Sequence, residues 1–343
     1  MREKQNPLKR LMSINGMASV LTAFVGVVIL MIVFSIMNPN FIKFDSVMNL
    51  LRSIVPFLLV GIGQGYVCIT GNIDLSIGSV LAMSAMISAT MVCNGFSVLV
   101  AVLVAFVCCM LVGLINGVLV GKFELPPFIA TLGTMTIARG VAQLANGNYN
   151  TDNIGSTGAA QVFKDVLYYG KTLGVYNGVW IAIIVWAVFF FVLTFTRSGR
   201  HIYAVGSNVD AARLSGVNVF ATTTKAYMVS AFCSFLTGLI TMAQSGMGDM
   251  SAGMSYEMYG VAAAVIGGIS TLGGSGLLVG VIAGASVWAI LQSGLTFAHV
   301  PVAYRNIVIG IIVVVCVMLD VLRRKGNGKH SKSTKKAAEK AAK

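Results

Sequence analysis

The chain has 343 residues, of which 57% are hydrophobic and only 10% are charged, and its mean hydropathy is +0.86. Soluble domains carry about a quarter charged residues, so this composition excludes a soluble globular protein. The formal net charge is +13, but nine of the 24 basic residues lie in the tail 323–343, so the charge does not indicate a nucleic-acid partner. The apolar runs are continuous rather than alternating, which predicts an all-α, polytopic protein embedded in a lipid bilayer.

A helix needs about 20 apolar residues to cross a bilayer. The apolar runs predict about ten spans, at residues 17–37, 54–70, 76–92, 98–120, 128–145, 179–195, 226–243, 259–272, 277–297 and 306–322. Residues 1–16 carry four basic residues, and no small-residue cleavage site ends the first run. The sequence therefore predicts a retained first span and a cytoplasmic N-terminus.

If the ten spans cross the membrane alternately from a cytoplasmic N-terminus, the basic residues divide unevenly between the two sides of the membrane. The segments placed inside hold 18 Lys and Arg and the segments placed outside hold five, with Arg139 inside a span. This bias agrees with the positive-inside rule, so both termini are expected in the cytoplasm. The expected organisation is a cytoplasmic N-terminus (1–16), a transmembrane domain (17–322) and a solvated basic tail (323–343) within reach of anionic headgroups.

The cytoplasmic loop 197–224 contains a short predicted helix. Asn208 is a good N-cap, Asp210 suits the positive end of the helix dipole, and Gly216 can end the helix in the left-handed conformation. One interpretation is a helix that only joins two spans, and the other is a helix that a partner protein grips. The residues concerned are Asn208, Asp210, Ala211, Ala212, Arg213, Leu214, Ser215 and Gly216.

Two glycine-rich breaks, 61–79 and 266–276, lie in opposite halves of the chain and resemble each other loosely. Paired breaks of this kind are typical of inverted repeats around a substrate path. Asp74 lies in the first break beside Asn72 and Ser76, and a buried carboxylate in a bilayer must face water or a partner group. Asp74 is therefore either a pathway or gate residue, or a helix cap at the membrane boundary. Arg139 is expected to snorkel toward the outer face.

The sequence lacks the motifs for nucleotide binding, hydrolysis and metal binding. The sequence near Gly117 is one residue short of a nucleotide-binding P-loop and lacks its Ser or Thr, and no hydrolase motif is present. The six cysteines and three histidines form no ligand cluster, so no metal or other cofactor is expected. A membrane enzyme is thereby disfavoured. An ion-coupled secondary transporter stays as the alternative function, with Asp74 as its one strong candidate ion site.

Two outer segments are candidate docking surfaces. They are 146–178, with room for a short lid or helix, and 245–258.

Several motifs together resemble one family. They are GNIDLSIGS at 71–79, LPPFIATLGT at 125–134 with ARG at 138–140, GRHIYAVG at 199–206, AARLSGVN at 211–218, AAAVIGG at 262–268 and GGSG at 273–276. In this order they resemble the membrane permease of bacterial ABC sugar importers of the ribose/xylose/galactose type. The similarity runs over most of the chain except the termini. Asn72 departs from the family, which usually has a second glycine there, and the basic tail is longer than expected.

The resemblance implies a translocation subunit and not an enzyme. Two copies would form the pathway, two ATPase domains would bind inside, and a soluble sugar-binding protein would deliver a monosaccharide, ribose as the first guess. The 208–216 helix would be the coupling helix seated in the ATPase. The resemblance also implies pathway positions at Asn72, Asp74, Ser76, Pro126, Pro127, Phe128 and Thr131.

Overall fold

The structure is a computed structural model that describes residues 17–305, 307–308, 310–311, 314–315 and 318. The predicted terminal segments 1–16 and 323–343 lie outside the described residues, as does much of the predicted last span, 306–322. The elements are α2 (Met17–Met37), η1 (Pro39–Ile42), α3 (Phe44–Ile69), α4 (Ile77–Cys93), α5 (Val98–Gly121), α6 (Pro127–Leu144), α7 (Gly158–Lys164), η2 (Asp165–Tyr169), β1 (Lys171–Thr172), β2 (Val175–Tyr176), α8 (Asn177–Phe195), α9 (Arg197–Ser207), α10 (Val209–Leu214), α11 (Val219–Ser245), α12 (Tyr256–Ile266) and α13 (Leu278–Phe297).

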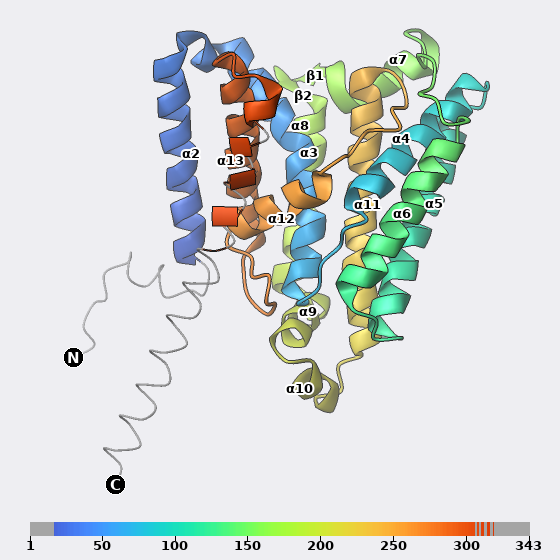
Figure 1. Cartoon of the computed structure of the whole chain (residues 1–343), viewed down its shortest axis with the longest axis vertical. Coiled ribbons are helices and arrows are strands. Elements are labelled where there is room, and N and C mark those ends of the chain that lie inside the picture. Colours follow the sequence, from blue (N-terminus) through green and yellow to red (C-terminus); the bar gives the residue numbers. More distant parts are fainter. Residues whose placement is uncertain (1–16, 306, 309, 312–313, 316–317, 319–343) are drawn as a thin grey trace.

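Long helices run side by side between two ends of the molecule (Figure 1). α9 and α10 project at one end, called here the α10 end, while α7, β1 and β2 lie at the opposite end, called the hairpin end. Among the described residues, six helices are long and apolar enough to cross a membrane: α2 from Ser19, α3, α5, α8, α11 and α13. The expectation of an all-α, multi-pass membrane protein is confirmed at this level.

α11 is the central helix, and it packs against α3, α4 and α5. Its contact with α5 passes through Gly113, Gly117 and Gly121, which recur every four residues on one face of α5. A Cβ at Gly117 would lie only 2.6 Å from the Cα of Thr224 in α11. Small residues at this spacing let two helix backbones approach closely. In a bilayer, where the hydrophobic effect does not drive helices together, such close packing stabilises helix association.

Three predicted spans have clearly different bounds in the structure. α11 begins at Val219, seven residues before the predicted 226. α3 begins at Phe44, ten residues before the predicted 54. Its early part is polar, and side chains at the hairpin end contact it. The Arg52 guanidinium lies 4.2 Å from the ring centre of Tyr168 and 4.1 Å from that of Tyr176. The predicted span 259–272 is wrong. α12 has 11 residues and ends before Gly267, and at 1.5 Å per residue it covers about half of the hydrocarbon core.

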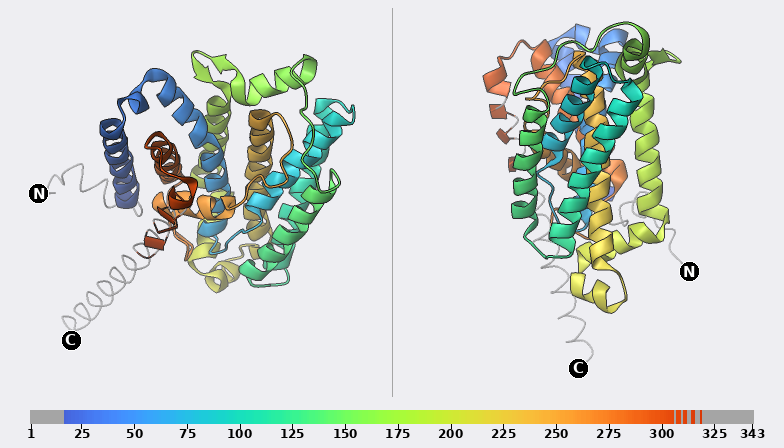
Figure 2. Two further views of the ribbon diagram at one scale, coloured as in Figure 1. Left: turned by 45° about the horizontal axis from the view of Figure 1, so that its top comes forward. Right: turned by 90° about the vertical axis from the view of Figure 1, so that its right-hand side faces the viewer.

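α4 and α12 both begin part of the way between the two ends, each after a non-helical segment (Figure 1). The segment 70–76 rises from the α10 end into α4, and the segment 246–255 descends from the hairpin end into α12. The first turn of α4 meets the segment before α12 at glycines, since a Cβ on Gly78 would overlap the Gly253 carbonyl oxygen. The further views in Figure 2 show the compact bundle and the projecting α9 and α10 from other sides.

The segment 146–178, which the sequence indicated to be long enough for a short lid or helix, contains the short helix α7. Sequence reasoning missed the antiparallel hairpin, in which Lys171 pairs with Tyr176 and Thr172 with Val175. Its turn residues, Leu173 and Gly174, have φ values of +54° and +79°. Two left-handed residues in succession match the twist of a tight hairpin, but a leucine there gave no turn signal.

Candidate functional site

The short helix predicted in the cytoplasmic loop is present as α10. The Asn208 side chain accepts a hydrogen bond of 2.8 Å from the Ala211 amide, and Gly216 closes the helix with a φ of +79°. Ala212 turns inward and is buried, whereas Leu214 is 90% exposed. A large apolar side chain at the tip of a capped helix, with no cover of its own, is suited to a protein partner.

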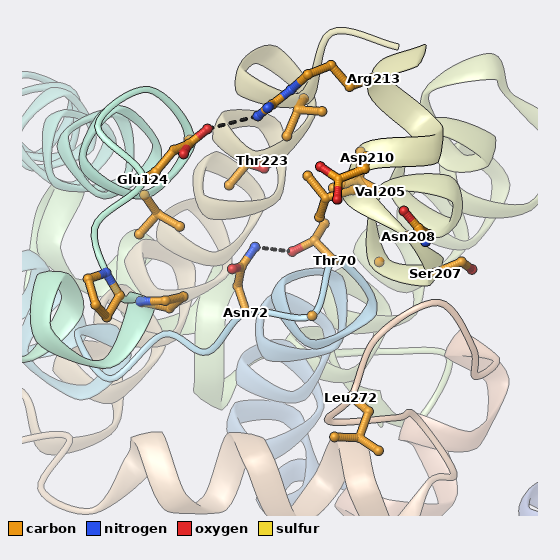
Figure 3. Close-up of a pocket in the computed structure, with 18 of the residues that line it drawn as sticks. Thr70, Asn72, Glu124, Val205, Ser207, Asn208, Asp210, Arg213, Thr223 and Leu272 are labelled. Atoms are coloured by element: carbon orange, nitrogen blue, oxygen red, sulfur yellow. Dashed lines mark hydrogen bonds and ion pairs between the residues drawn. The ribbon is translucent and has the colours of Figure 1, made fainter. Parts of the chain in front are cut away.

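A cavity of ≈ 540 Å³ opens beside α10 (Figure 3). It collects residues from segments far apart in the sequence, and its wall includes both predicted coupling positions and predicted pathway positions. Thr70 and Asn72 come from the end of α3 and the segment after it, and the Asn72 amide donates a 2.8 Å hydrogen bond to Thr70. Asn208, Asp210 and Arg213 face it from α10 and its cap. The end of α5, the loop after it and the start of α6 supply Gly121, Glu124, Leu125, Pro126 and Pro127.

An ion pair crosses this cavity. The Arg213 guanidinium lies 2.8 Å from a carboxylate oxygen of Glu124, and both side chains are more than half exposed (Figure 3). No other ion pair occurs in the part of the chain that the structure describes. The sequence contained both charges but no spacing that pairs positions 89 residues apart, so Glu124 was missed as a partner of α10.

α9 is joined to the rest of the protein by buried contacts. A Cβ at Gly206 would overlap the Ile69 carbonyl oxygen, and that same oxygen accepts a 2.8 Å hydrogen bond from the Gly274 amide. Tyr203 donates a 2.7 Å hydrogen bond to the Gly276 carbonyl, and burial raises the pKa of Tyr203 to about 12, so its phenol stays a donor at physiological pH. We call this set of contacts between α9, the end of α3 and the loop 267–277 the α9 joint.

Because backbones touch at the α9 joint, a methyl group added at Gly206 is expected to destabilise the fold strongly. Gly206→Ala is expected to lower the free energy of unfolding by about 1–3 kcal/mol, because a backbone carbonyl cannot move aside as a side chain can. The measurement is thermal unfolding of the purified protein in detergent. Gly26→Ala in α2 is the matched control, since nothing lies within 4 Å of a Cβ there. Equal melting temperatures for the two variants would contradict the close packing of the joint.

Asp74 lies at the centre of a buried polar cluster. One carboxylate oxygen accepts from the Ser76 amide at 2.9 Å and from the Ser76 hydroxyl at 2.6 Å, and the other accepts from the Ser230 hydroxyl at 2.7 Å. Asn116 donates to the Ser76 hydroxyl at 2.9 Å and accepts from Thr134 at 2.6 Å. The cluster thereby ties the start of α4 to α5, α6 and α11.

Asp74 is closed off from the cavities, and its acceptor role lies just before α4 begins. Asp74 is only 2% exposed, it lines none of the cavities described, and it bonds the amide two residues ahead at the start of α4. Ser76 is equally buried, and Thr131 is buried with its hydroxyl donated to the Pro127 carbonyl at 2.8 Å. Phe128 is 58% exposed at the start of α6. The predicted pathway positions therefore separate into an open group beside α10, namely Asn72, Pro126 and Pro127, a closed group, namely Asp74, Ser76 and Thr131, and Phe128, which is exposed on α6 outside the cavity.

The expectation for Arg139 is wrong. One guanidinium nitrogen donates to the Met250 carbonyl at 2.9 Å and to the Ala252 carbonyl at 2.8 Å, so the side chain clamps the descending segment before α12 instead of snorkelling. Backbone carbonyls left free by the broken helix are strong acceptors, and a cation within reach satisfies two of them at once. Among the described residues, no three His, Cys, Asp or Glu side chains gather as a metal site.

The described residues form a bundle of membrane-length helices with two shorter helices, α4 and α12, and a capped helix at one end, which is the architecture of a multi-pass membrane protein. The chain matches, over residues 46–317, the family described as the permease component of the branched-chain amino acid transport system. It therefore belongs to this permease family, the membrane subunits of ABC importers, and this disfavours the ion-coupled alternative.

The chain is similar to curated permeases over most of its length. It is 35% identical over 299 residues to the ribose import permease of Haemophilus influenzae, covering 87% of this chain and 92% of that protein. Identity to the ribose import permease of Bacillus subtilis is 34% over 306 residues, 89% and 94% of the two chains. The D-allose transport system permease of Escherichia coli is 31% identical over 306 residues, 88% and 91%. No solved structure matches the chain. The resemblance to sugar-importer permeases is confirmed.

Proposed function

We propose that this permease passes a monosaccharide, with ribose as the first substrate to test, from a soluble binding protein outside the bacterial plasma membrane to the cytoplasm. The observation that carries the proposal is the similarity along nearly the whole chain to permeases named for ribose import. The chain acts as the translocation subunit, and a separate ABC ATPase hydrolyses the ATP. Its two ATPase domains bind at the α10 end, which faces the cytoplasm together with both termini.

In this proposal α10 is the coupling helix, within the coupling segment 197–224. Leu214 and Val209 offer exposed apolar contacts to a groove of the ATPase, while buried Ala212 anchors the helix. The Asn208 cap and the left-handed Gly216 hold α10 in shape without help from the partner. Preformed helices bind at a lower entropic cost than segments that fold on contact.

The proposed path opens toward the cytoplasm beside Asn72, Pro126 and Pro127, and a second copy of the chain supplies the opposite wall. A methyl group added at Gly133 or Gly140 of α6 would have no neighbour within 4 Å in one protomer, which leaves room for another helix. Three buried residues do not line the path but hold α4 and α6 in place: Asp74, Ser76 and Thr131. The sugar contacts are weak, because the binding protein selects the substrate.

The finer architecture is part of the proposal. Residues 17–322 form one permease domain of ten membrane segments, in which α4 and α12 cross only part of the bilayer. The units α3–α4 and α11–α12 are the equivalent parts of an inverted repeat. Each pairs a long helix with a shorter one that starts after a non-helical segment, and the two long helices run in opposite directions (Figure 1). Internal repeats with broken helices are typical of transporters with alternating access.

Reconstitution tests the function directly. Vesicles that contain the permease with its ATPase are expected to accumulate ribose when ATP is enclosed and the binding protein is added outside. Uptake should continue when an uncoupler collapses the ion gradients at constant ATP. Uptake abolished by the uncoupler would instead support the ion-coupled transporter, and ATP-driven uptake of another sugar in place of ribose would correct the substrate alone.

A further inference from the structure

The two helices of the coupling segment are attached to the protein in contrasting ways. α9 is fixed by the α9 joint, where glycines bring backbones into contact and the Gly274 amide bonds the Ile69 carbonyl. α10 reaches across the cavity to the loop between α5 and α6 through one ion pair, Arg213–Glu124, with side chains 58% and 69% exposed. Backbones touch at the α9 joint, whereas α10 meets the α5–α6 loop only through exposed side-chain tips across the cavity of ≈ 540 Å³, which both attachments border.

The α5–α6 loop is built to pass a displacement to α6. Glu124 has a φ of +53°, a conformation unfavourable for a residue with a Cβ, and only two residues separate it from Pro127, the first residue of α6. Pro126 and Pro127 have fixed φ angles, so this connection bends little. A displacement of the Glu124 backbone is therefore passed to the start of α6, whose Thr134 belongs to the Asp74 cluster.

An exposed ion pair is a weak bond, so it can open and close at a small cost in free energy. Side-chain entropy and solvent screening leave such a pair able to shift the balance between two arrangements only a few-fold. A buried pair would hold one arrangement permanently, because separating it leaves an unpaired charge out of water.

We propose that the Arg213–Glu124 pair is a latch between the coupling helix and α6, and that Glu124 is a positioning residue for transport. The latch is closed in the present arrangement and opens when the ATPase moves α10. The α9 joint stays intact throughout, so α9, the end of α3 and the loop 267–277 move as one body. This inference rests on the proposed function of α10 as the coupling helix.

Removal of the Glu124 charge tests the latch in vesicles that contain permease, ATPase and binding protein. Glu124→Gln is expected to raise ATP hydrolysis without sugar about two- to fivefold and to lower the sugar imported per ATP by a similar factor, since the closed arrangement loses its bond. Glu124→Asp keeps the carboxylate and should retain the wild-type ratio. Lys122→Gln, an equal charge neutralisation at an exposed position of the same loop, is the matched control.

A cross-link tests the opening itself. In a background with exposed Cys93 replaced by Ser, Glu124→Cys and Arg213→Cys are joined by a short bismaleimide. The latch predicts that the reagent stops import by the double variant, while either single variant treated in the same way imports as before treatment. A fully cross-linked double variant that still imports sugar at its untreated rate would overturn the latch. A wild-type permease that imports no sugar would instead contradict the proposed function.

Discussion

Replacing Asp74 with leucine is expected to lower the free energy of unfolding of the permease by about 3 kcal/mol or more. Three donors lose their acceptor: the Ser76 amide, the Ser76 hydroxyl and the Ser230 hydroxyl. Both serines are at most 1% exposed, so water cannot replace the carboxylate. Each buried donor left unpaired costs about 1–3 kcal/mol, against a typical total stability of about 5–15 kcal/mol. Thermal unfolding in detergent and the yield of monodisperse protein measure the effect.

Asp74→Asn separates the two interpretations of this residue by function. The amide oxygen of asparagine can still accept from both donors of Ser76, and the Ser230 hydroxyl can turn to accept from the new amide group. A helix cap therefore predicts a folded variant that keeps at least about half of the wild-type uptake. A folded Asp74→Asn protein without any uptake would contradict the cap and assign Asp74 a direct role in the path.

Replacing Leu214 with aspartate is expected to reduce ATP-driven sugar uptake at least tenfold, which corresponds to about 1.4 kcal/mol of lost coupling contact. Leu214 is 90% exposed, so its replacement should change the stability of the permease itself by no more than about 0.5 kcal/mol. A charge placed in an apolar groove of a partner stays desolvated and unpaired. Uptake into vesicles is measured beside the melting temperature of the same preparation.

Leu214→Met is the control for this prediction, because it preserves apolar volume and should keep most of the uptake. Normal uptake by Leu214→Asp would show that α10 is not the contact that drives transport. A variant that loses uptake together with its melting temperature would show a structural role for Leu214, in conflict with its exposure.

The parts of the fold that follow from local chemistry were predicted from the sequence. α2 has the predicted bounds, and α5, α8 and α13 lie within two residues of theirs, because continuous apolar runs between polar turns define a span. α10 was predicted with its cap, since Asn208, Asp210 and Gly216 are signals that act within a few residues. The family followed from motifs that keep their order along the chain.

The parts that depend on contacts between distant segments were missed. The predicted span was extended to residue 272, although α12 ends before Gly267. An apolar run does not show where a helix ends, and it does not show that the glycines after it pack on α9. Arg139 was placed at the outer face because its acceptors, two backbone carbonyls over 100 residues away, leave no trace in the sequence. Glu124 was overlooked for the same reason: its pairing with Arg213 exists only in the folded chain.

Capture of the ATPase from Ala211 is the most direct test of the central claim that α10 couples this permease to an ABC ATPase. A photo-reactive amino acid is placed at Ala211, which is exposed on α10, or at Leu173, which is 88% exposed in the hairpin at the opposite end. We predict that irradiation of intact cells joins the ATPase to the chain from position 211 and not from position 173. Capture of the ATPase from position 173, or from neither position while the permease supports uptake, would contradict the role of α10.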